Sequence, residues 1–325
     1  MTATKAIATV DNTAFISVEN FGDTTIEGFI ASRHCAKTTA KTYRNGIRQM
    51  LKYFAAKAIT APETGDVDNF INTLRADKKS DATIRLYSAT LKLFFAYLDK
   101  QGIYRNVAAD IEPLRLKKAK THKKSSLTNA QAQKLLAAVK GDSVILLRDK
   151  AVVALALQTG LRTCEISRAN VGNFNDCGSY WTLDIIGKGS TTADATVKVA
   201  LQVAELINEY LDARGSRALD EPLFKSTSHN TGWQKNSYGA RLSEQSVGKL
   251  IAKYMKVAGV KSSKITAHST RHYSAVQAIR NGIDLREVSS MLRHSSLSVT
   301  LIYLDDISVE SRRAELSVAS SLFCA

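Results

Sequence analysis

The sequence lacks the features that are typical of secreted and membrane proteins. Its four cysteines include no CxxC pair and show no regular spacing, so neither a disulfide framework nor a zinc ribbon is indicated. The N-terminus has no continuous apolar core of the kind found in signal peptides. No apolar run approaches the ~20 residues that a membrane span needs. These absences favour a soluble protein of the reducing cytoplasm.

Acidic residues are scarce relative to basic ones. The chain carries 45 Lys and Arg against 30 Asp and Glu, a formal net charge of +15. A surplus of this size repels itself unless it meets a polyanion, and nucleic acid is the commonest one. A basic but otherwise ordinary enzyme is the plainer alternative. The length of 325 residues exceeds the usual single-domain size, so two domains are expected.

Helical periodicity begins near Thr24, after a flexible lead-in over residues 1–20. In the stretch "TTAKTYRNGIRQMLKYFAAK" an apolar face opposes a stripe of cations. The stripe consists of Lys41, Arg44, Arg48 and Lys52. It could bind phosphates or simply be a solvated face. With the helical patterns "DVDNFINTLRAD" and "SDATIRLYSATLKLFFAYLDKQG", it predicts an all-helical bundle over residues 21–111.

Residues 112–126, "EPLRLKKAKTHKKSS", have the composition of an interdomain linker. Their cations could follow a nucleic-acid backbone, where each phosphate contact releases counterions. A purely solubilising linker is the alternative. The cations are Arg115, Lys117, Lys118, Lys120, Lys123 and Lys124. A helical domain, a cationic linker and a larger domain together suggest a clamp that closes around a duplex.

Residues 127–325 predict a second, mixed α/β domain, so the fold class expected is mainly α with a small β-hairpin. Thr128 or Asn129 caps its first helix, and Gly160 ends a buried one. The segments "WTLDIIGKGS" and "TVKVAL" read as two strands of a hairpin. The further helices are expected over about 200–214, 243–258, 266–281, 284–293 and 298–315.

Two motifs place cations just beyond rigid elements. In "TGLRTCEI", Arg162 follows the helix stop at Gly160, and Glu165 three residues on could form a structural salt bridge with it. In "IIGKGST", Lys188 stands between two glycines at the hairpin edge. Glycines leave such a lysine unobstructed over a ligand, although a turn lysine can also be merely solvated.

A third motif, "AHSTRHYSA", puts His268, Arg271 and His272 within about one helical turn. His268 and Arg271 are three apart and share a face. A zinc site is not expected, because the zincin pattern needs glutamate directly after the first histidine and the chain has Ser269. The arginine would also repel a divalent cation.

The fourth motif is "MLRHSSLSVTLIYLDD". His294 and Tyr303 are nine positions apart, which would separate them by ~13 Å on one straight helix. If Ser295 or Ser296 caps a new helix, His294 lies in the turn before it and Tyr303 about two turns inside. Both side chains could then face a common site.

The four motifs together indicate phosphoryl transfer to a tyrosine. Arginines supply forked donors that match the nonbridging oxygens of a phosphodiester. A lysine can protonate a leaving alkoxide, and a histidine can act as acid or base. A tyrosine can attack phosphorus and conserve the bond energy as a phosphotyrosine. The fixed cations stabilise the developing charge, so no metal or other cofactor is required.

The order and spacing of these motifs resemble the tyrosine recombinase, or phage integrase, family over about residues 24–316. The family's TGLR-x-x-E, H-x-x-R-H and L-G-H-x-x-x-x-x-T-x-x-Y boxes read here T-G-L-R-T-C-E, H-S-T-R-H and L-R-H-S-S-L-S-V-T-L-I-Y. The resemblance implies that Arg162 and Arg271 clamp the scissile phosphate. It also makes the N-terminal bundle similar to the family's SAM-like core-binding domain.

The resemblance implies roles for the other motif residues as well. Tyr303 would be the nucleophile and Lys188 the general acid. His268 and His294 would assist proton transfer and phosphate binding, and Glu165 would support the site from behind.

The sequence departs from the family pattern at several points. Position 293 is arginine where glycine is usual, and position 270 is threonine where leucine is common. The hairpin loop lacks the second basic residue that the family often has there. Too little chain precedes Thr24 for a folded arm-binding domain. The C-terminal "SVESRRAELSVASSLFCA" is amphipathic and could be exchanged between protomers or pack on its own domain.

The resemblance implies site-specific strand exchange through a covalent 3′-phosphotyrosine and a Holliday junction. The partner would be double-stranded DNA with short inverted core sites, bound by a homo-tetramer of protomers that are monomeric in solution and act at the nucleoid. Whether the task is integration, excision, inversion or resolution stays open, as does any need for accessory proteins. The alternatives are a type IB topoisomerase and a DNA-binding regulator that has lost cleavage.

Overall fold

The computed structural model describes residues 21–111, 125–187, 190, 192–227, 239–294 and 296–306. The chain divides into two compact units, Met1–Lys118 and Ala119–Ala325. Each unit has its own hydrophobic core. The predicted lead-in, the cationic linker residues, Lys188 and the amphipathic C-terminal tail lie outside the described residues.

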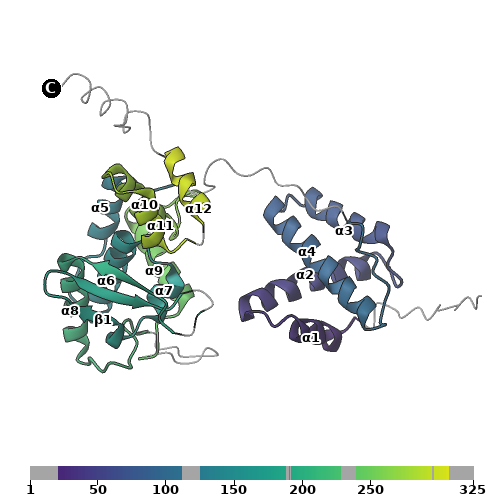
Figure 1. Ribbon diagram of the computed structural model, residues 1–325, viewed down its shortest axis with the longest axis horizontal. Helices are drawn as coiled ribbons and strands as arrows, with labels where there is room; N and C mark the ends of the chain where they lie inside the picture. The colour runs from purple at the N-terminus through teal and green to yellow at the C-terminus, as the bar shows by residue number, and fades with distance from the viewer. Residues whose placement is uncertain are drawn as a thin grey trace, which may run out of the picture. The chain divides into compact units, whose positions relative to one another are not determined.

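The N-terminal unit is a helical bundle, as the periodicity predicts (Figure 1). Its helices are α1 (Asp23–Ser32), α2 (Lys37–Ala56), α3 (Thr64–Ala76) and α4 (Asp81–Lys100). The Ser80 hydroxyl accepts the backbone N–H of Thr83 and caps α4. Aromatic side chains fill the core edge to face, for example Phe29 and Phe94 with ring centroids 5.4 Å apart.

The cationic stripe of α2 is divided between free and paired side chains. Lys41 and Lys52 are exposed. Arg44 donates to both carboxylate oxygens of Glu27, at 2.6 and 2.5 Å, and Arg48 contacts Asp23 at 2.9 Å. These acids belong to α1, so the predicted stripe exists but two of its four charges already have partners within the unit.

The C-terminal unit combines helices with one small sheet (Figure 1). Its first part contains α5 (Asn129–Ala137), α6 (Val144–Thr159), α7 (Thr163–Arg168), the short 3-10 helix η2 (Val171–Asn173), β1 (Phe174–Asp176), β2 (Trp181–Ile185) and β3 (Ala195–Val199). Its second part contains α8 (Leu201–Arg214), α9 (Glu244–Val257), α10 (Ser269–Arg280), α11 (Leu285–Leu292), α12 (Leu297–Leu301) and the 3-10 helix η3 (Ile302–Asp306).

The sheet is antiparallel, in the order β1-β2-β3. Trp181 pairs with Val199 and Ile185 with Ala195, so β2 and β3 form the predicted hairpin. Strand β1 was not predicted, because its three residues are too few to show an alternating pattern. The hairpin loop that carries Lys188 therefore leaves the sheet between Ile185 and Ala195.

Helix α6 is the centre of this unit and contacts α5, α8, α9, α10 and β3. It is buried on nearly all sides, as expected for a helix that is apolar all round. It ends at Gly160 in the left-handed conformation, with φ 63°, which confirms the predicted stop. The chain therefore turns at Gly160 and releases Arg162 at a fixed point.

The last predicted helix, 298–315, is wrong in its form over the part that the structure describes, residues 298–306. This part is α-helical up to Leu301, in the helix Leu297–Leu301, and continues as the tighter 3-10 helix Ile302–Asp306, while residues 307–315 lie outside the described residues. The β-branched residues of "LSVTLI" lower helix propensity, and the two aspartates that follow oppose the negative end of a helix dipole. Tyr303 consequently lies in a 3-10 segment rather than two turns inside an α-helix.

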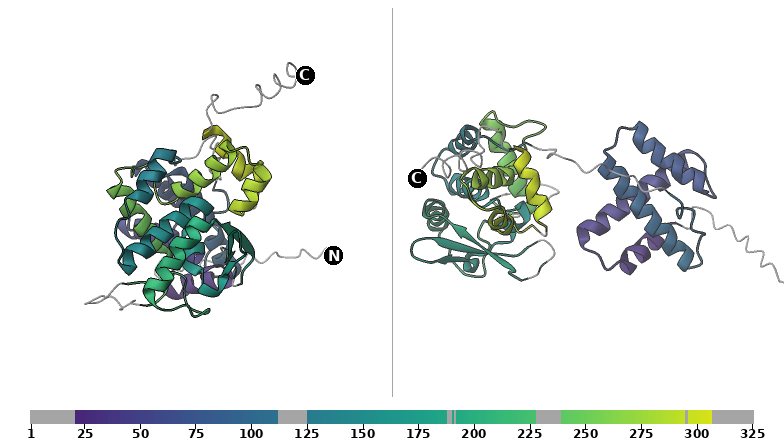
Figure 2. Two further views of the ribbon diagram at one scale, coloured as in Figure 1. Left: turned by 90° about the vertical axis from the view of Figure 1, so that its left-hand side faces the viewer. Right: turned by 45° about the horizontal axis from the view of Figure 1, so that its top comes forward.

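The segments α10, α11 and η3 share a small core of their own. It consists of Ala275, Val276, Val288, Leu292 and Tyr303. The yellow and yellow-green C-terminal helices stay grouped in every view (Figure 2). No helix among the described residues is both long and apolar enough to cross a bilayer.

Two glycines allow a test of how tightly α6 and α11 pack. Gly160 and Gly215 both end helices at positive φ, 63° and 74°. A Cβ at Gly160 would lie 2.8 Å from Leu292 Cδ2, whereas one at Gly215 meets nothing within 4 Å. Gly215→Ala should cost about 1 kcal/mol of unfolding free energy from backbone strain alone. Gly160→Ala should cost about 1–3 kcal/mol more, from overpacking.

Both tryptophans of the chain belong to the C-terminal unit, so urea unfolding followed by tryptophan fluorescence reports the stability of this unit. Equal losses in the two variants would show that the contact between Gly160 and Leu292 does not constrain the packing.

Candidate active site

Arg162 is held at the junction of α6 and α7. It is the N-cap residue of α7, with extended backbone angles of φ −71° and ψ 152°. Its backbone N–H donates to Glu165 Oε2 at 2.6 Å, and its Nη1 donates to Glu165 Oε1 at 3.0 Å. The salt bridge that the sequence suggested is therefore present, and it also caps the helix.

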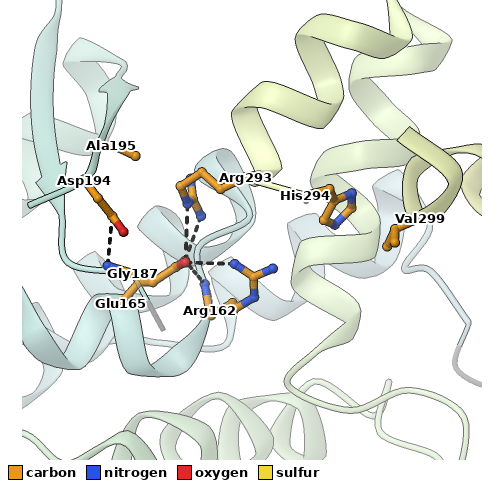
Figure 3. A pocket seen from close by; sticks show the side chains of 8 residues that line it. All are labelled: Arg162, Glu165, Gly187, Asp194, Ala195, Arg293, His294 and Val299. Carbon is orange, nitrogen blue, oxygen red and sulfur yellow. Dashed lines mark hydrogen bonds and ion pairs between the residues drawn. The ribbon is translucent and has the colours of Figure 1, made fainter. Parts of the chain in front are cut away.

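Glu165 is fully buried and receives a second arginine. Arg293 Nη2 donates to Oε2 at 2.7 Å and Nε donates to Oε1 at 3.3 Å. Figure 3 shows the carboxylate between the two guanidinium groups. Burial alone would raise the pKa of Glu165, but the charge and hydrogen bond of Arg293, together with Arg162, hold it below its ordinary value. Glu165 is therefore ionised at neutral pH.

Arg293 ends α11 in the left-handed conformation, at φ 55° and ψ 51°. The backbone N–H of Arg293 donates to the Ser290 carbonyl and that of His294 to the Ser289 carbonyl, at 2.9 and 3.1 Å. This is the Schellman pattern, which usually has glycine at the position of Arg293. The turn fixes the backbone of His294 directly after the helix.

Arg271 projects from α10 into the interior and is 2 % exposed. Its Nη1 donates to the Gly160 carbonyl at 2.7 Å, and its Nη2 donates to the Leu292 carbonyl. It therefore joins the ends of α6 and α11. Burial, followed by the neighbouring charge of Arg162, lowers the pKa of Arg271 to about 10, so the guanidinium keeps its charge at neutral pH.

Tyr303 lies between two histidine rings. Its ring centroid is 5.3 Å from that of His272, edge to face, and 6.0 Å from that of His294, nearly parallel. His268, the N-cap residue of α10, stands 5.1 Å from His272 in the same series of rings. The structure thus brings the third and fourth motifs together around the tyrosine, which is itself 2 % exposed.

His294 is oriented by Thr300. Its Nδ1 lies 2.8 Å from Thr300 Oγ1, a hydroxyl on a fully buried residue of α12. Ser296 caps this helix by accepting the backbone N–H of Ser298, which confirms one of the two predicted caps. Sequence reasoning missed Thr300 and gave His272 no role beyond a rejected metal site. The fixed threonine of the third box was the available signal for Thr300.

A cavity of about 500 Å³ opens beside these residues. Its lining residues are Arg162, Glu165, Gly187, Asp194, Ala195, Arg293, His294 and Val299. The base of the hairpin loop is fixed at this cavity, because Gly187 donates its N–H to Asp194 at 3.1 Å and its carbonyl accepts from Arg168 at 2.5 Å. Lys188 itself is outside the described residues, but its neighbour Gly187 lines the cavity.

The cavity is suited to an anion. Two guanidinium groups, those of Arg162 and Arg293, pair with one buried carboxylate, and the charge of Arg271 also acts on it, so positive charge remains to neutralise a bound phosphate. Among the residues that the structure describes, no group of three or more His, Cys, Asp or Glu side chains could hold a metal ion. Phosphate binding here would depend on arginine side chains.

Comparison with known families shows to which protein family the chain belongs. Residues 125–308 match the model of the phage integrase family, and residues 26–102 match that of the phage integrase N-terminal SAM-like domain. The chain belongs to the phage integrase family. The resemblance drawn from the three boxes is therefore confirmed, and each family model lies within one of the two compact units.

Related members of this integrase family are recombinases. The tyrosine recombinase XerC of Thermodesulfovibrio yellowstonii is 29% identical over 276 residues, which cover 82% of this chain and 84% of that protein. The XerH site-specific recombinase, solved in a post-cleavage complex with a palindromic difH substrate, matches with a TM-score of 0.68 at 21% identity, covering 92% of this chain and 84% of that one.

A lambda integrase tetramer bound to a Holliday junction matches with a TM-score of 0.65 at 16% identity, covering 88% and 80% of the two chains. Likeness at such identities concerns the fold. With the family and the sequence relatives, it makes this integrase-family protein a site-specific tyrosine recombinase of mainly helical, two-domain architecture. None of these three relatives is named as a topoisomerase or a regulator.

The lowered pKa of Glu165 predicts how stability depends on pH. The ionised carboxylate stabilises the fold fully above its unfolded pKa of about 4.3, and this contribution is lost as the pH falls through the lower folded pKa. Glu165→Gln, which cannot titrate, should be about 3 kcal/mol less stable than wild type at pH 7. The difference should shrink below pH ~4.

Urea unfolding of both proteins between pH 7 and pH 3 measures this difference. A difference that stays constant over the whole range would show that the Glu165 carboxylate is not held ionised by its arginines.

Proposed function

We propose that the protein cleaves and rejoins DNA at specific sites, with Tyr303 as the nucleophile. The observation that carries this proposal is the position of Tyr303 between His272 and His294, within electrostatic range of buried Arg271 and near a cavity lined by Arg162 and His294. A tyrosine with rings on both sides and arginines nearby has the groups that attack on phosphorus requires.

The reaction exchanges one phosphodiester for another. Tyr303 Oη forms a bond to phosphorus while the bond from phosphorus to the 5′ oxygen breaks, which leaves a 3′-phosphotyrosine and a free 5′ hydroxyl. The tyrosine proton passes to a histidine, and the departing 5′ oxygen takes a proton from Lys188. A 5′ hydroxyl of the other duplex then attacks the phosphotyrosine and releases Tyr303, so bond energy is conserved.

Two arginines would bind the scissile phosphate. Arg162 uses one side-chain nitrogen on Glu165 and keeps 32% of its side chain exposed, so the other end of its fork can meet a phosphate oxygen. Arg271 spends two of the five N–H groups of a guanidinium on the carbonyls of Gly160 and Leu292. His268 and His294 would add donors and move the proton.

Attack requires a local movement, because Tyr303 is almost fully buried in the small core of α10, α11 and η3. The segment that carries it is only five residues of 3-10 helix. Short 3-10 segments have poorer hydrogen-bond geometry than α-helices and often mark hinges. We therefore assign the hinge to η3.

DNA would be contacted by both units as double-stranded core sites in inverted repeat. Lys41 and Lys52 of α2 offer exposed charges to the backbone. The cationic linker could add to them. Because a lambda integrase of like fold is known as a tetramer on a Holliday junction, the protein would act as a tetramer on synapsed DNA, with its C-terminal tail exchanged between protomers. Such an enzyme would work at the nucleoid, with or without accessory proteins.

Tyr303→Phe tests the nucleophile. The substrates are nicked duplexes that carry the inverted repeats found in the DNA flanking the gene, so that cleavage releases a short fragment and traps the adduct. Wild type should form a covalent adduct that survives SDS gels, and Tyr303→Phe should form none while it still binds the duplex. Phenylalanine keeps the ring contacts with His272 and His294, so folding should be unchanged.

An adduct with Tyr303→Phe, or none with wild type on a duplex that it binds specifically, would contradict the proposed function.

The paired and free cations of α2 predict different effects on DNA binding. Lys41→Ala and Lys52→Ala should each reduce the slope of log K against log salt by about 0.9, because each removes one phosphate contact. Arg44→Ala serves as the matched control, since Glu27 already neutralises Arg44, and its slope should change less. Fluorescence anisotropy at several salt concentrations measures the slopes. An unchanged slope in both lysine variants would exclude this face from the DNA contact.

A further inference from the structure

Arg293 is an unusual residue for its backbone. It is one of four non-glycine residues at positive φ in the described chain, and it closes a Schellman turn that glycine normally closes. A non-glycine residue in this conformation costs about 1 kcal/mol. A residue kept at that cost, next to His294 and on the wall of the cavity, points to a contribution from its side chain.

All three guanidinium nitrogens of Arg293 donate hydrogen bonds inside the protein. Its Nε and Nη2 donate to Glu165, and its Nη1 donates to the Met291 carbonyl at 2.7 Å. Its side chain is 14% exposed, less than half the value for Arg162. Arg293 therefore lines the cavity with all three nitrogens already engaged, which does not suit a phosphate ligand.

As a result, every hydrogen-bond acceptor site of the Glu165 carboxylate is occupied. A carboxylate offers about four lone-pair sites. In Glu165 they are taken by the backbone N–H and Nη1 of Arg162 and by Nε and Nη2 of Arg293. The two arginines divide the carboxylate between them, and Arg162 receives only one side-chain contact.

This division leaves Arg162 directed toward the cavity. In Figure 3 one nitrogen of its guanidinium meets Glu165 and the other points away, toward the side of His294. If Arg293 were absent, the buried carboxylate would lose two donors, and a bidentate pair with Arg162 would be the closest way to replace them. The guanidinium would then turn onto Glu165 and away from the position where a phosphate binds.

We propose that Arg293 is a positioning residue for strand cleavage. It fills two of the four acceptor sites of the Glu165 carboxylate and thereby keeps the Arg162 guanidinium turned to the cavity. It also connects the turn before His294 to α7. It acts through Arg162 and His294 and does not touch the DNA. The inference rests on the proposed function, since it concerns the same phosphate site.

Three variants test this role. Arg293→Gly restores the residue that the turn favours and removes the partner of Glu165, and cleavage of the nicked duplex should slow by about 10- to 100-fold. Affinity for the uncut duplex should change less than about 2-fold, because few phosphate contacts are lost. Arg293→Lys keeps one charged donor and should recover part of the rate. It also serves as the test if the glycine variant does not fold.

Lys78→Gly is the matched control. Lys78 has φ 55°, the same as Arg293, and lies in the N-terminal unit, so its replacement relieves the same backbone conformation without touching the site. Its cleavage rate should equal that of wild type. In a Glu165→Gln background, Arg293→Gly should slow cleavage less than it does alone, because the carboxylate that Arg293 occupies is gone.

Each outcome separates the inference from the proposed function. Wild-type cleavage by Arg293→Gly would overturn the positioning role while the loss of adducts in Tyr303→Phe stood. Equal losses of affinity and cleavage rate would make Arg293 a phosphate ligand and overturn it as well. Adducts with Tyr303→Phe would instead remove the proposed function itself.

Discussion

The rest of the site depends on the hydrogen bonds that the buried guanidinium of Arg271 donates to two backbone carbonyls. A charged group with 2 % exposure is tolerated only where hydrogen bonds replace its lost hydration, and here the carbonyls of Gly160 and Leu292 supply them. Those two carbonyls stand at the ends of α6 and α11. Because the elements that follow carry Arg162 and His294, one desolvated cation sets the distance between two halves of the site.

The arginines around Arg271 carry more positive charge than the buried carboxylate near them can neutralise. Arg162 and Arg293 pair with a single buried carboxylate, Glu165, and Arg271 interacts with it only through its charge, so this carboxylate does not neutralise all three arginines. Repulsion among like charges costs folding free energy, and a phosphate bound as proposed would relieve it. The surplus of positive charge that destabilises the free protein would then favour substrate binding, a compromise common in enzymes with a preorganised electrostatic site.

Local sequence patterns were sufficient to predict the structural features that depend on residues close together in the chain. The stop at Gly160, the caps at Ser80 and Ser296, and the β2–β3 hairpin all follow from residues within a few positions of one another. The three boxes also located the residues that the structure gathers around Tyr303. These features are predictable because their physical causes are local.

What could not be predicted depends on contacts across long stretches of chain. Arg293 and Glu165 are 128 positions apart, and no periodicity links them. The ion pairs of Arg44 and Arg48 with α1 likewise turn an apparent DNA-facing stripe into a partly neutralised one. The 3-10 form of η3 reflects a competition between weak helix propensity and the packing of one tyrosine ring, which a helical pattern alone does not reveal.

The burial of the Tyr303 ring has a consequence for how often unwanted DNA cleavage could occur. Because Tyr303 is part of a hydrophobic core with Val276, Val288 and Leu292, withdrawing it exposes apolar surface worth about 2 kcal/mol. At equilibrium such a cost leaves the tyrosine outside its core in only about 3% of free molecules. If Tyr303 is the nucleophile, as proposed, a free protomer is mostly inactive, and the free energy that releases the tyrosine has to come from binding. Burying the proposed nucleophile in a core would then make accidental strand breakage rare.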